Sequence, residues 1–540
     1  NVGDIVDLCR RLDGIPLAIE LAVARLRVMS PAQIVKRLDE RFRLLVSGSR
    51  STGNRHQTLQ ATIDWSYDLL DEQERLGFRR LSWFTGDFSL EAACYVVGFE
   101  PLDDFDVIEV LSNLVDKSMV APEQGHDGST RYRLLESVRQ YGRFRLAEST
   151  DSDQVALRHG EYYADFSEDL QVRQRQGQLG EALVQRDQDE SNLRAALRWT
   201  LDQRQGVIAA RIIAALGYLW YAAGLYREGI DWCRELAELS PDLSDDLMAG
   251  VLHAHGTLLG SWSEPAVGAD LLAQEIELRR ELDDPVRLAS ALNNYGNLQQ
   301  DLGLFDEASV SILEAIELFR AAGASPGLSL CSLGHGLSHR GDYERAAERF
   351  EEALEEGHRA GEQFLIAQAT QYLGVCRARQ GRFEEARRLI EQGRSGFDQL
   401  QVAPGVADAD FNLAVIDRAE GLLDDASWRL LACLSVPEAH WYRATQFWIL
   451  QVAASIIADP ATAAELLGAA IAHYDRSTEP QPAFVFDDLA STRTMLAERL
   501  GAAFEHRLER GRTLQQTAAI ALAIAGLHAF IDREAGADAA

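Results

Sequence analysis

The chain is almost free of lysine, which occurs only at Lys36 and Lys117 among 540 residues. Arginine therefore carries nearly all of the positive charge, a bias that we attribute first to a GC-rich genome. Acidic residues outnumber basic ones by 84 to 53, and the net charge is −31. This charge excludes a chain that coats nucleic acid or an acidic membrane along its whole length, because both attract cations. A local basic patch is still compatible with it.

Cysteine is also scarce, and long apolar runs are absent. The six cysteines are scattered without a Cys-x-x-Cys pair, so we expect small core residues of a reduced protein rather than a structural disulfide. The most apolar stretch, 517–531, is too short to span a bilayer. We expect no signal peptide and no membrane contact, and hence a cytoplasmic protein. Because the first residue is Asn1, we also expect a fragment or a processed chain.

The motifs of common catalytic and metal sites are missing as well. A P-loop ends in Gly-Lys-Ser/Thr, whose amides and lysine hold phosphates, and neither lysine here follows a glycine. No nucleophile elbow accompanies a Ser-His-Asp set. His335 and His339 have a spacing that can hold a metal, but no third ligand lies at a recognisable spacing. We therefore expect no catalytic residues, no metal, and no cofactor held by this chain alone.

A chain of this length is too long for one core, so several domains or a repeat array are expected. Residues 1–50 are predicted to be helical, with Ser30 as the N-cap of a third helix. Residues 56–150 are predicted to hold three helices, a two-stranded wing (118–124 and 131–136) and a closing helix. That order of elements is typical of a winged helix.

The helix starts of this predicted winged helix follow from their capping residues. Asp71 and Glu74 have the spacing of a capping box, in which each side chain accepts from the backbone of the other residue. Ser89 is the expected cap of the second helix. Asp104 or Asp106 is expected to open the third.

From about residue 155 onward the chain is predicted to be helical, with an internal repeat. The stretches GLFDEA, GDYERA, GRFEEA and GLLDDA recur about every 40 residues, a period that indicates a helical solenoid. We place this solenoid at 155–450 and a helical cap at 455–540. Small residues around each turn glycine would let the two helices of a repeat touch. The predicted packing positions are Gly296, Gly303, Ala308, Gly334, Gly341, Ala346, Gly374, Gly381, Ala386, Gly421 and Ala426.

The repeats resemble tetratricopeptide repeats over about 200–440. In the first 150 residues, three stretches carry a second resemblance: GIPLAIELAVARL, then RLDERFRLLVSGSR followed by RHQTLQATIDWSYDLL, then LVDKSMV through RYRLLESVRQYG. Together they resemble the end of a STAND-class nucleotide switch, the NB-ARC-type ATPases of plant resistance proteins, apoptotic ATPases and large regulators. The likeness is closest to actinobacterial LuxR-type and adenylate-cyclase-associated regulators.

The resemblance implies a role for Gly14, Pro16 and Leu17 of the GIPLA motif. In the family this motif follows the nucleotide-binding domain and its proline packs near the adenine. ATP or ADP is therefore expected only with an upstream domain that is missing from this sequence. The family often carries a Met-His-Asp triplet whose histidine reaches the β-phosphate, whereas residues 134–136 here read Leu-Leu-Glu. Leucine cannot donate to a phosphate, which puts phosphate sensing at that position in doubt.

Two predictions about DNA follow from the charges of the winged helix. The helix before the wing, 103–117, carries five carboxylates against Lys117, so phosphates would repel it. The helix after the wing is basic. Its arginines either contact an anion or DNA, or meet acidic faces of neighbouring domains. The candidates are Arg131, Arg133, Arg139 and Arg143.

We thus expect a mainly α protein with a helical subdomain, a winged helix and a tetratricopeptide-like α-solenoid. The resemblance implies the regulatory arm of a STAND-type transcriptional or signalling regulator. Its solenoid would bind an inducer or a partner protein and relay this to a nucleotide switch, its own ATPase core, which would then oligomerise. Two alternatives stay open: a stand-alone tetratricopeptide adaptor for protein–protein interaction, and a DNA-binding winged-helix regulator. Periodicity does not identify the inducer.

Overall fold

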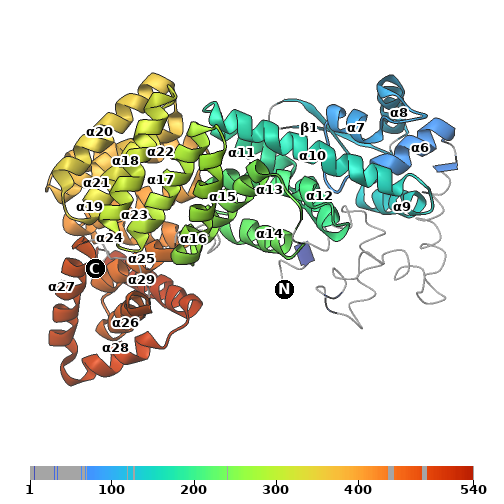
Figure 1. The fold of residues 1–540 in the computed structure, drawn as a ribbon. Coiled ribbons are helices and arrows are strands. Elements are labelled where there is room, and N and C mark those ends of the chain that lie inside the picture. Colours follow the sequence, from blue (N-terminus) through green and yellow to red (C-terminus); the bar gives the residue numbers. More distant parts are fainter. Residues whose placement is uncertain are drawn as a thin grey trace, which may run out of the picture. The chain divides into compact units, whose positions relative to one another are not determined.

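The computed structural model describes residues 70–538, except for 118, 126–127, 240, 436–442 and 477–482, together with a few single residues nearer the start. Gly14, Pro16 and Leu17 lie outside the described residues, as does most of the helical subdomain. The chain separates into two compact units, described here one at a time: Asn1–Ser167 with Val184–Ile212, and Glu168–Leu183 with Ile213–Ala540 (Figure 1).

The first unit contains the winged helix. Its elements are α6 (Glu72–Leu81), α7 (Leu90–Val97), α8 (Asp104–Asp116), β1 (Ala121–Gln124), β2 (Thr130–Arg133) and α9 (Glu136–Ala147). The two strands are antiparallel, with Ala121 opposite Arg133 and Gln124 opposite Thr130. Phe88 adds a bridge to Tyr132 on the other edge of β2, through backbone hydrogen bonds of 2.9 and 2.8 Å.

Two helix caps lie where the sequence predicts them, and α8 begins at Asp104, one of the two residues expected to open it. Asp71 and Glu74 form the predicted capping box, and Ser89 accepts from the Ala92 amide. The residue that caps α8 is Asp103, which the sequence analysis did not name. Its side chain accepts from the Asp106 amide at 2.9 Å while the Asp106 carboxylate accepts from the Asp103 amide, which forms a second capping box.

The first wing strand starts later than predicted and the second ends earlier, although the second begins one residue sooner, at Thr130. The amides of Met119 and Val120 donate to the Leu114 carbonyl at 2.9 and 3.2 Å, so these residues close the end of α8 and leave strand pairing to begin at Ala121. At the other end, the Leu135 carbonyl already accepts from the Arg139 amide. Leu135 is thus the N-cap of α9 and not a strand residue.

The core of the winged helix consists of aromatic and aliphatic side chains from α6, the segment after it, and α8. Phe78, Phe84, Phe88 and Leu114 are fully buried, and the rings of Phe84 and Phe88 stack with centroids 4.3 Å apart. Further helices follow along the chain: α10 (Ser152–Arg175), α11 (Leu179–Gln188), α12 (Glu190–Asp202) and α13 (Gly206–Ala222).

The second unit contains a row of helical hairpins (Figure 1). Each repeat has a first and a second helix, and the two pack against each other. After α13 come α14 (Tyr226–Leu239), α15 (Asp245–Trp262), α16 (Pro265–Glu281), α17 (Pro285–Asp301), α18 (Phe305–Ala321), α19 (Gly327–His339), α20 (Tyr343–Ala360), α21 (Gln363–Arg379), α22 (Phe383–Gln399), α23 (Ala403–Ala419) and α24 (Leu423–Ser435).

The predicted packing positions lie at the turns and crossings of these hairpins. The turn glycines have positive φ angles between 77° and 81°, a backbone conformation that costs other residues free energy: Gly303, Gly341, Gly381 and Gly421. The small residues after the turns are fully buried: Ala308, Ala346, Ala386 and Ala426. Where the helices cross, a Cβ atom on Gly296, Gly334 or Gly374 would lie within 2.9 Å of Ile312, Phe350 or Ile390, respectively.

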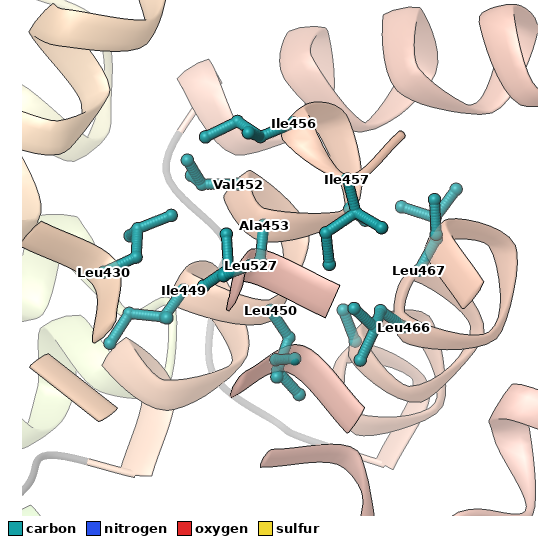
Figure 2. Close-up of a cluster of buried hydrophobic side chains, with 14 of the residues drawn as sticks. Leu430, Ile449, Leu450, Val452, Ala453, Ile456, Ile457, Leu466, Leu467 and Leu527 are labelled. Carbon is teal, nitrogen blue, oxygen red and sulfur yellow. The ribbon is translucent and has the colours of Figure 1, made fainter. Parts of the chain in front are cut away.

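The C-terminal part forms its own core on the last repeat. It consists of α25 (Arg443–Ile456), α26 (Pro460–Arg476), α27 (Ala483–Leu500), the 3-10 turn η3 (Gly501–Ala503), α28 (Phe504–Arg512) and α29 (Gln516–Asp538). Figure 2 shows side chains of α25, α26 and α29 gathered with Leu430 of α24 around Ile449, Leu450 and Ala453. In the described ranges, no helix is both apolar enough and long enough to cross a bilayer.

Candidate ligand-binding wall of the solenoid

The first helices of the repeats form one continuous wall. Within the described residues, α15, α17, α19, α21 and α23 each pack against the next first helix, whereas α16, α18, α20 and α22 make no comparable contacts among themselves. The side on which helices approach each other is the inside of a curved row. We call the side chains that these first helices, with α13, present on that side the inner wall.

Polar side chains connect neighbouring first helices along the inner wall. The Asn294 amide on α17 donates to Thr257 Oγ1 on α15 at 3.1 Å, and the Gln300 amide donates to the Ser332 carbonyl on α19 at 2.9 Å. Gln371 on α21 donates from Nε2 to Asp408 Oδ2 on α23 at 2.5 Å. The wall is therefore a polar surface that joins one repeat to the next.

Asp408 is a carboxyl group of this wall with a raised pKa and no cationic partner among the described residues. Burial raises the pKa of its carboxyl to about 7, and the single hydrogen bond from Gln371 only partly offsets that effect. Two other aspartates on α23 have arginine partners. Asp410 pairs with Arg394 at 2.7 Å, and Asp417 pairs with Arg429 at 2.9 Å. No such cation contacts Asp408 among the described residues.

Aromatic rings surround this part of the inner wall. The rings of His335 and Tyr372 are edge to face with centroids 4.0 Å apart, and Phe350 stacks on Tyr372 at 5.7 Å. Burial raises the pKa of Tyr372, and the charges of Asp408 and Tyr221 add to this, which places these groups near one another. Tyr221 lies 6.0 Å from Tyr218, centroid to centroid, on α13.

The histidine pair singled out from the sequence does not form a metal site in this part of the chain. The rings of His335 and His339 lie 6.5 Å apart, and burial lowers their pKa values to about 3 and about 4. Both imidazoles are therefore neutral at physiological pH. The described residues contain no cluster of three or more histidine, cysteine or acidic side chains that could hold a metal ion.

A second polar cluster lies at α15, α16 and α17, and the sequence analysis missed it. His253 Nδ1 lies 2.9 Å from Glu275 Oε2, and Arg279 bridges Glu275 and Asp246 at 3.4 and 2.5 Å. Arg287 also donates to Asp246, at 2.6 Å. Glu275 and Arg279 are almost fully buried, so the centre of this network joins α15 to α16 and leaves little for a ligand to contact. Glu275 and Arg279 are four residues apart on one helix, but the other contacts join residues 22 to 41 apart and give no sequence signal.

The four candidate arginines of the winged helix all have partners within the first unit. Arg131 is buried and pairs with Asp87 and Asp189, each at 3.0 Å, and Arg133 pairs with Glu123 across the wing at 2.7 Å. Arg139 pairs with Glu136 at 2.8 Å. Arg143 lies 3.7 Å from the centroid of the Trp83 ring, and burial lowers its pKa to about 10. The acidic partners belong to the same unit rather than to a neighbouring domain, so contact with a neighbouring domain and contact with DNA both stay predictions.

The helix in the DNA-reading position, α8, exposes an acidic and apolar face. Phe105 and Ile108 are 82% and 45% exposed, and Asp104 and Glu109 lie beside them in the sequence. Lys117, the one cation at its end, is held by Glu74 at 2.5 Å. Such a face lacks the cations from which DNA affinity comes.

Comparisons with known proteins identify both modules. Residues 70–147 match the family model described as winged helix-turn-helix domain, and residues 287–355 match that of the tetratricopeptide repeat. The chain is 35% identical over 407 residues to a Mycobacterium tuberculosis protein named as an HTH-type transcriptional regulator, covering 73% of this chain and 45% of that protein. It is 29% identical over 370 residues to the regulatory protein AfsR of Streptomyces griseus, covering 61% and 35%.

A solved structure shows a weaker likeness. The STAND protein with a tetratricopeptide repeat sensor from Pyrococcus horikoshii matches 92% of this chain and 74% of its own, at 16% identity and a TM-score of 0.39. The chain spans less than half the length of the two curated relatives above. The predicted fold class is confirmed: a mainly α protein with a small wing and a tetratricopeptide solenoid. The predicted resemblance to the part of a bacterial regulator that contains a winged helix and tetratricopeptide repeats is confirmed as well.

Proposed function

On the premise that this chain joins a winged helix to a tetratricopeptide solenoid and is related to bacterial transcriptional regulators, we propose that it is the sensor arm of a STAND-type regulator. The inner wall binds an inducer or a partner protein. Binding changes how the solenoid and the winged helix pack on an ATPase core encoded outside this sequence. The observation that carries the proposal is that one chain contains both a polar inner wall and a winged helix whose α8 face is acidic.

The inner wall supports a binding role because some of its polar groups bridge two repeats. Asn294, Gln371 and Asp408 connect neighbouring repeats, so a ligand that touches them touches two repeats at once. A ligand can shift a two-state switch only by its difference in affinity for the two states. A group that bridges repeats senses their spacing and can provide that difference.

The winged helix supports a structural and switching role. Its arginines are paired inside the first unit, and its α8 face is acidic. A packing surface against another domain of the same protein fits these charges better than a DNA duplex does. The cytoplasmic location, the absence of catalysis in this chain, and ATP or ADP as the nucleotide of the core belong to the same proposal.

Two measurements test the proposal. Reading the coding DNA upstream of the codon for Asn1 should reveal a continuing frame that encodes Gly-x-x-x-x-Gly-Lys-Ser/Thr. The full-length protein should then have a larger mass by light scattering with a non-hydrolysable ATP analogue than with ADP. The proposed nucleotide switch would be refuted if the reading frame closes immediately upstream. It would also be refuted if the mass is the same with the ATP analogue and with ADP. The chain would then be a tetratricopeptide adaptor.

A further inference from the structure

We propose that Asp408, Gln371 and Tyr372 form a subsite of the inner wall that binds the ammonium group of the ligand. This inference rests on the proposed binding role of the inner wall and adds the chemical class of what is bound. The ligand carries a primary alkylammonium group, either on a small amine or on the lysine side chain of a peptide.

The first argument is the missing cation. Asp408, Asp410 and Asp417 lie on the same helix, and the last two each have arginine partners. Asp408 has the Gln371 amide and no arginine or lysine among the described residues. A carboxylate withdrawn from water is costly without a cation or several hydrogen bonds. Its persistence on a binding surface is explained if the ligand brings the cation.

The second argument is an unused acceptor beside the carboxylate. Gln371 is 1% exposed and spends its Nε2 group on Asp408, while its Oε1 atom has no hydrogen-bond partner in the described part of the chain. Buried amide oxygens are nearly always paired. An ammonium group has three donors. One can reach the Asp408 carboxylate and a second the Gln371 oxygen.

The third argument is the aromatic surroundings. Tyr372 follows Gln371 in the chain, its ring contacts His335, and Phe350 stacks on it. Ring faces attract alkylammonium cations, most strongly where water is reduced. His335 is neutral because of its burial, so it does not repel a bound cation. Asp408, Tyr372 and His335 are half-buried and thus still within reach of a ligand.

The ionisation of Asp408 makes the subsite testable. An ammonium group binds the carboxylate form, so affinity should be about tenfold higher at pH 8 than at pH 6 for a carboxyl with a pKa near 7. The groups that sense the Asp408 charge from neighbouring helices are Tyr372 on α21 and Cys433 on α24. Burial raises the pKa values of both, so neither ionises between pH 6 and pH 8.

Saturation-transfer NMR titrations of the whole chain provide the experiment. The small-molecule probe is n-butylamine with n-butanol as its neutral control. The peptide probe is N-acetyl-Gly-Lys-Gly-amide, with the same peptide acetylated on lysine as its control. We expect at least one amine to bind, its neutral control to bind at least tenfold more weakly, and Asp408→Asn to remove the difference. Asp425→Asn, the same change on the exposed surface of α24, should alter nothing.

A second variant keeps the test independent of folding defects. Gln371→Leu removes the donor that favours the carboxylate, so it should shift the pH of half-maximal amine binding upward. Whichever amine binds identifies the source, small molecule or peptide. Equal affinities for amine and neutral control, or unchanged amine binding by Asp408→Asn, would overturn the subsite. A lysine peptide that binds the wall no more tightly than its acetylated control would overturn the subsite too, yet leave the proposed sensor role intact.

Discussion

Replacing Asp408 by Asn should stabilise the protein, and increasingly so as the pH rises. Asn has the same shape and can keep a hydrogen bond to Gln371, but it cannot ionise. In the folded chain the pKa of Asp408 is raised from 3.8 to about 7. A carboxyl whose pKa is higher in the folded state lowers the free energy of unfolding as the pH rises above its unfolded value, and the loss levels off above the folded pKa.

The size of this stability gain follows from the pH range between the unfolded and the folded pKa of Asp408. Each pH unit between about 4 and 7 removes up to about 1.4 kcal/mol, and most of the interval from pH 5 to pH 8 lies inside it. Because the side chain is half-buried and solvent screens part of the effect, we expect Asp408→Asn to gain about 2 kcal/mol more at pH 8 than at pH 5.

Urea unfolding followed by circular dichroism at both pH values measures this gain. Asp425→Asn is the matched control, since the same substitution is made on the exposed surface of the second helix of that repeat. Its effect should be the same at pH 5 and pH 8. If the gain in stability of Asp408→Asn does not grow with pH, the raised pKa is refuted. The inference that this carboxyl lacks a cationic partner is then refuted as well.

Three further predictions concern other parts of the chain. Arg80→Met should destabilise the winged helix by about 3 kcal/mol in calorimetry. The reason is that Arg80 donates to the Val97, Phe99 and Glu100 carbonyls and pairs with Asp151. A loss below about 1 kcal/mol would contradict this. Gly341→Ala should cost about 1 kcal/mol in urea unfolding owing to its φ of 81°, and no cost would be inconsistent with that turn. In fluorescence anisotropy, the chain and its Arg133→Glu/Arg139→Glu variant should bind a DNA duplex equally weakly at physiological salt; salt-dependent binding lost in the variant would favour DNA recognition.

The repeat pattern predicted much of the solenoid because tetratricopeptide packing depends on a few short-range positions. A glycine with positive φ at the turn and a buried alanine five residues later occur in four of the hairpins, at 303/308, 341/346, 381/386 and 421/426, so the same letters recur. The capping box of α6 was predictable for the same reason. Asp71 and Glu74 are three residues apart, and their partners are their own backbone groups.

The inner wall could not be predicted in the same way. Nothing in the sequence ADADFNLAVID tells which aspartate has an arginine, because Arg394 and Arg429 come from α22 and α24, 16 and 19 residues from Asp410. The same holds for Gln371 and Asp408, which lie 37 residues apart. Their relation depends on how far each hairpin is rotated against the next, and the repeat pattern does not encode that rotation.

The way in which α29 returns onto the last repeat affects how the solenoid unravels. A row of stacked hairpins tends to fray at its ends, since a terminal unit has a neighbour on one side only. Here α24, α25 and α26 all pack against α29. The final hairpin, α23 with α24, is therefore covered on the side that has no further repeat. Backbone amides of α24 should therefore exchange with deuterium as slowly as those in the middle of the row. A pull on this end would have to detach α29 first, so the array has one reinforced terminus.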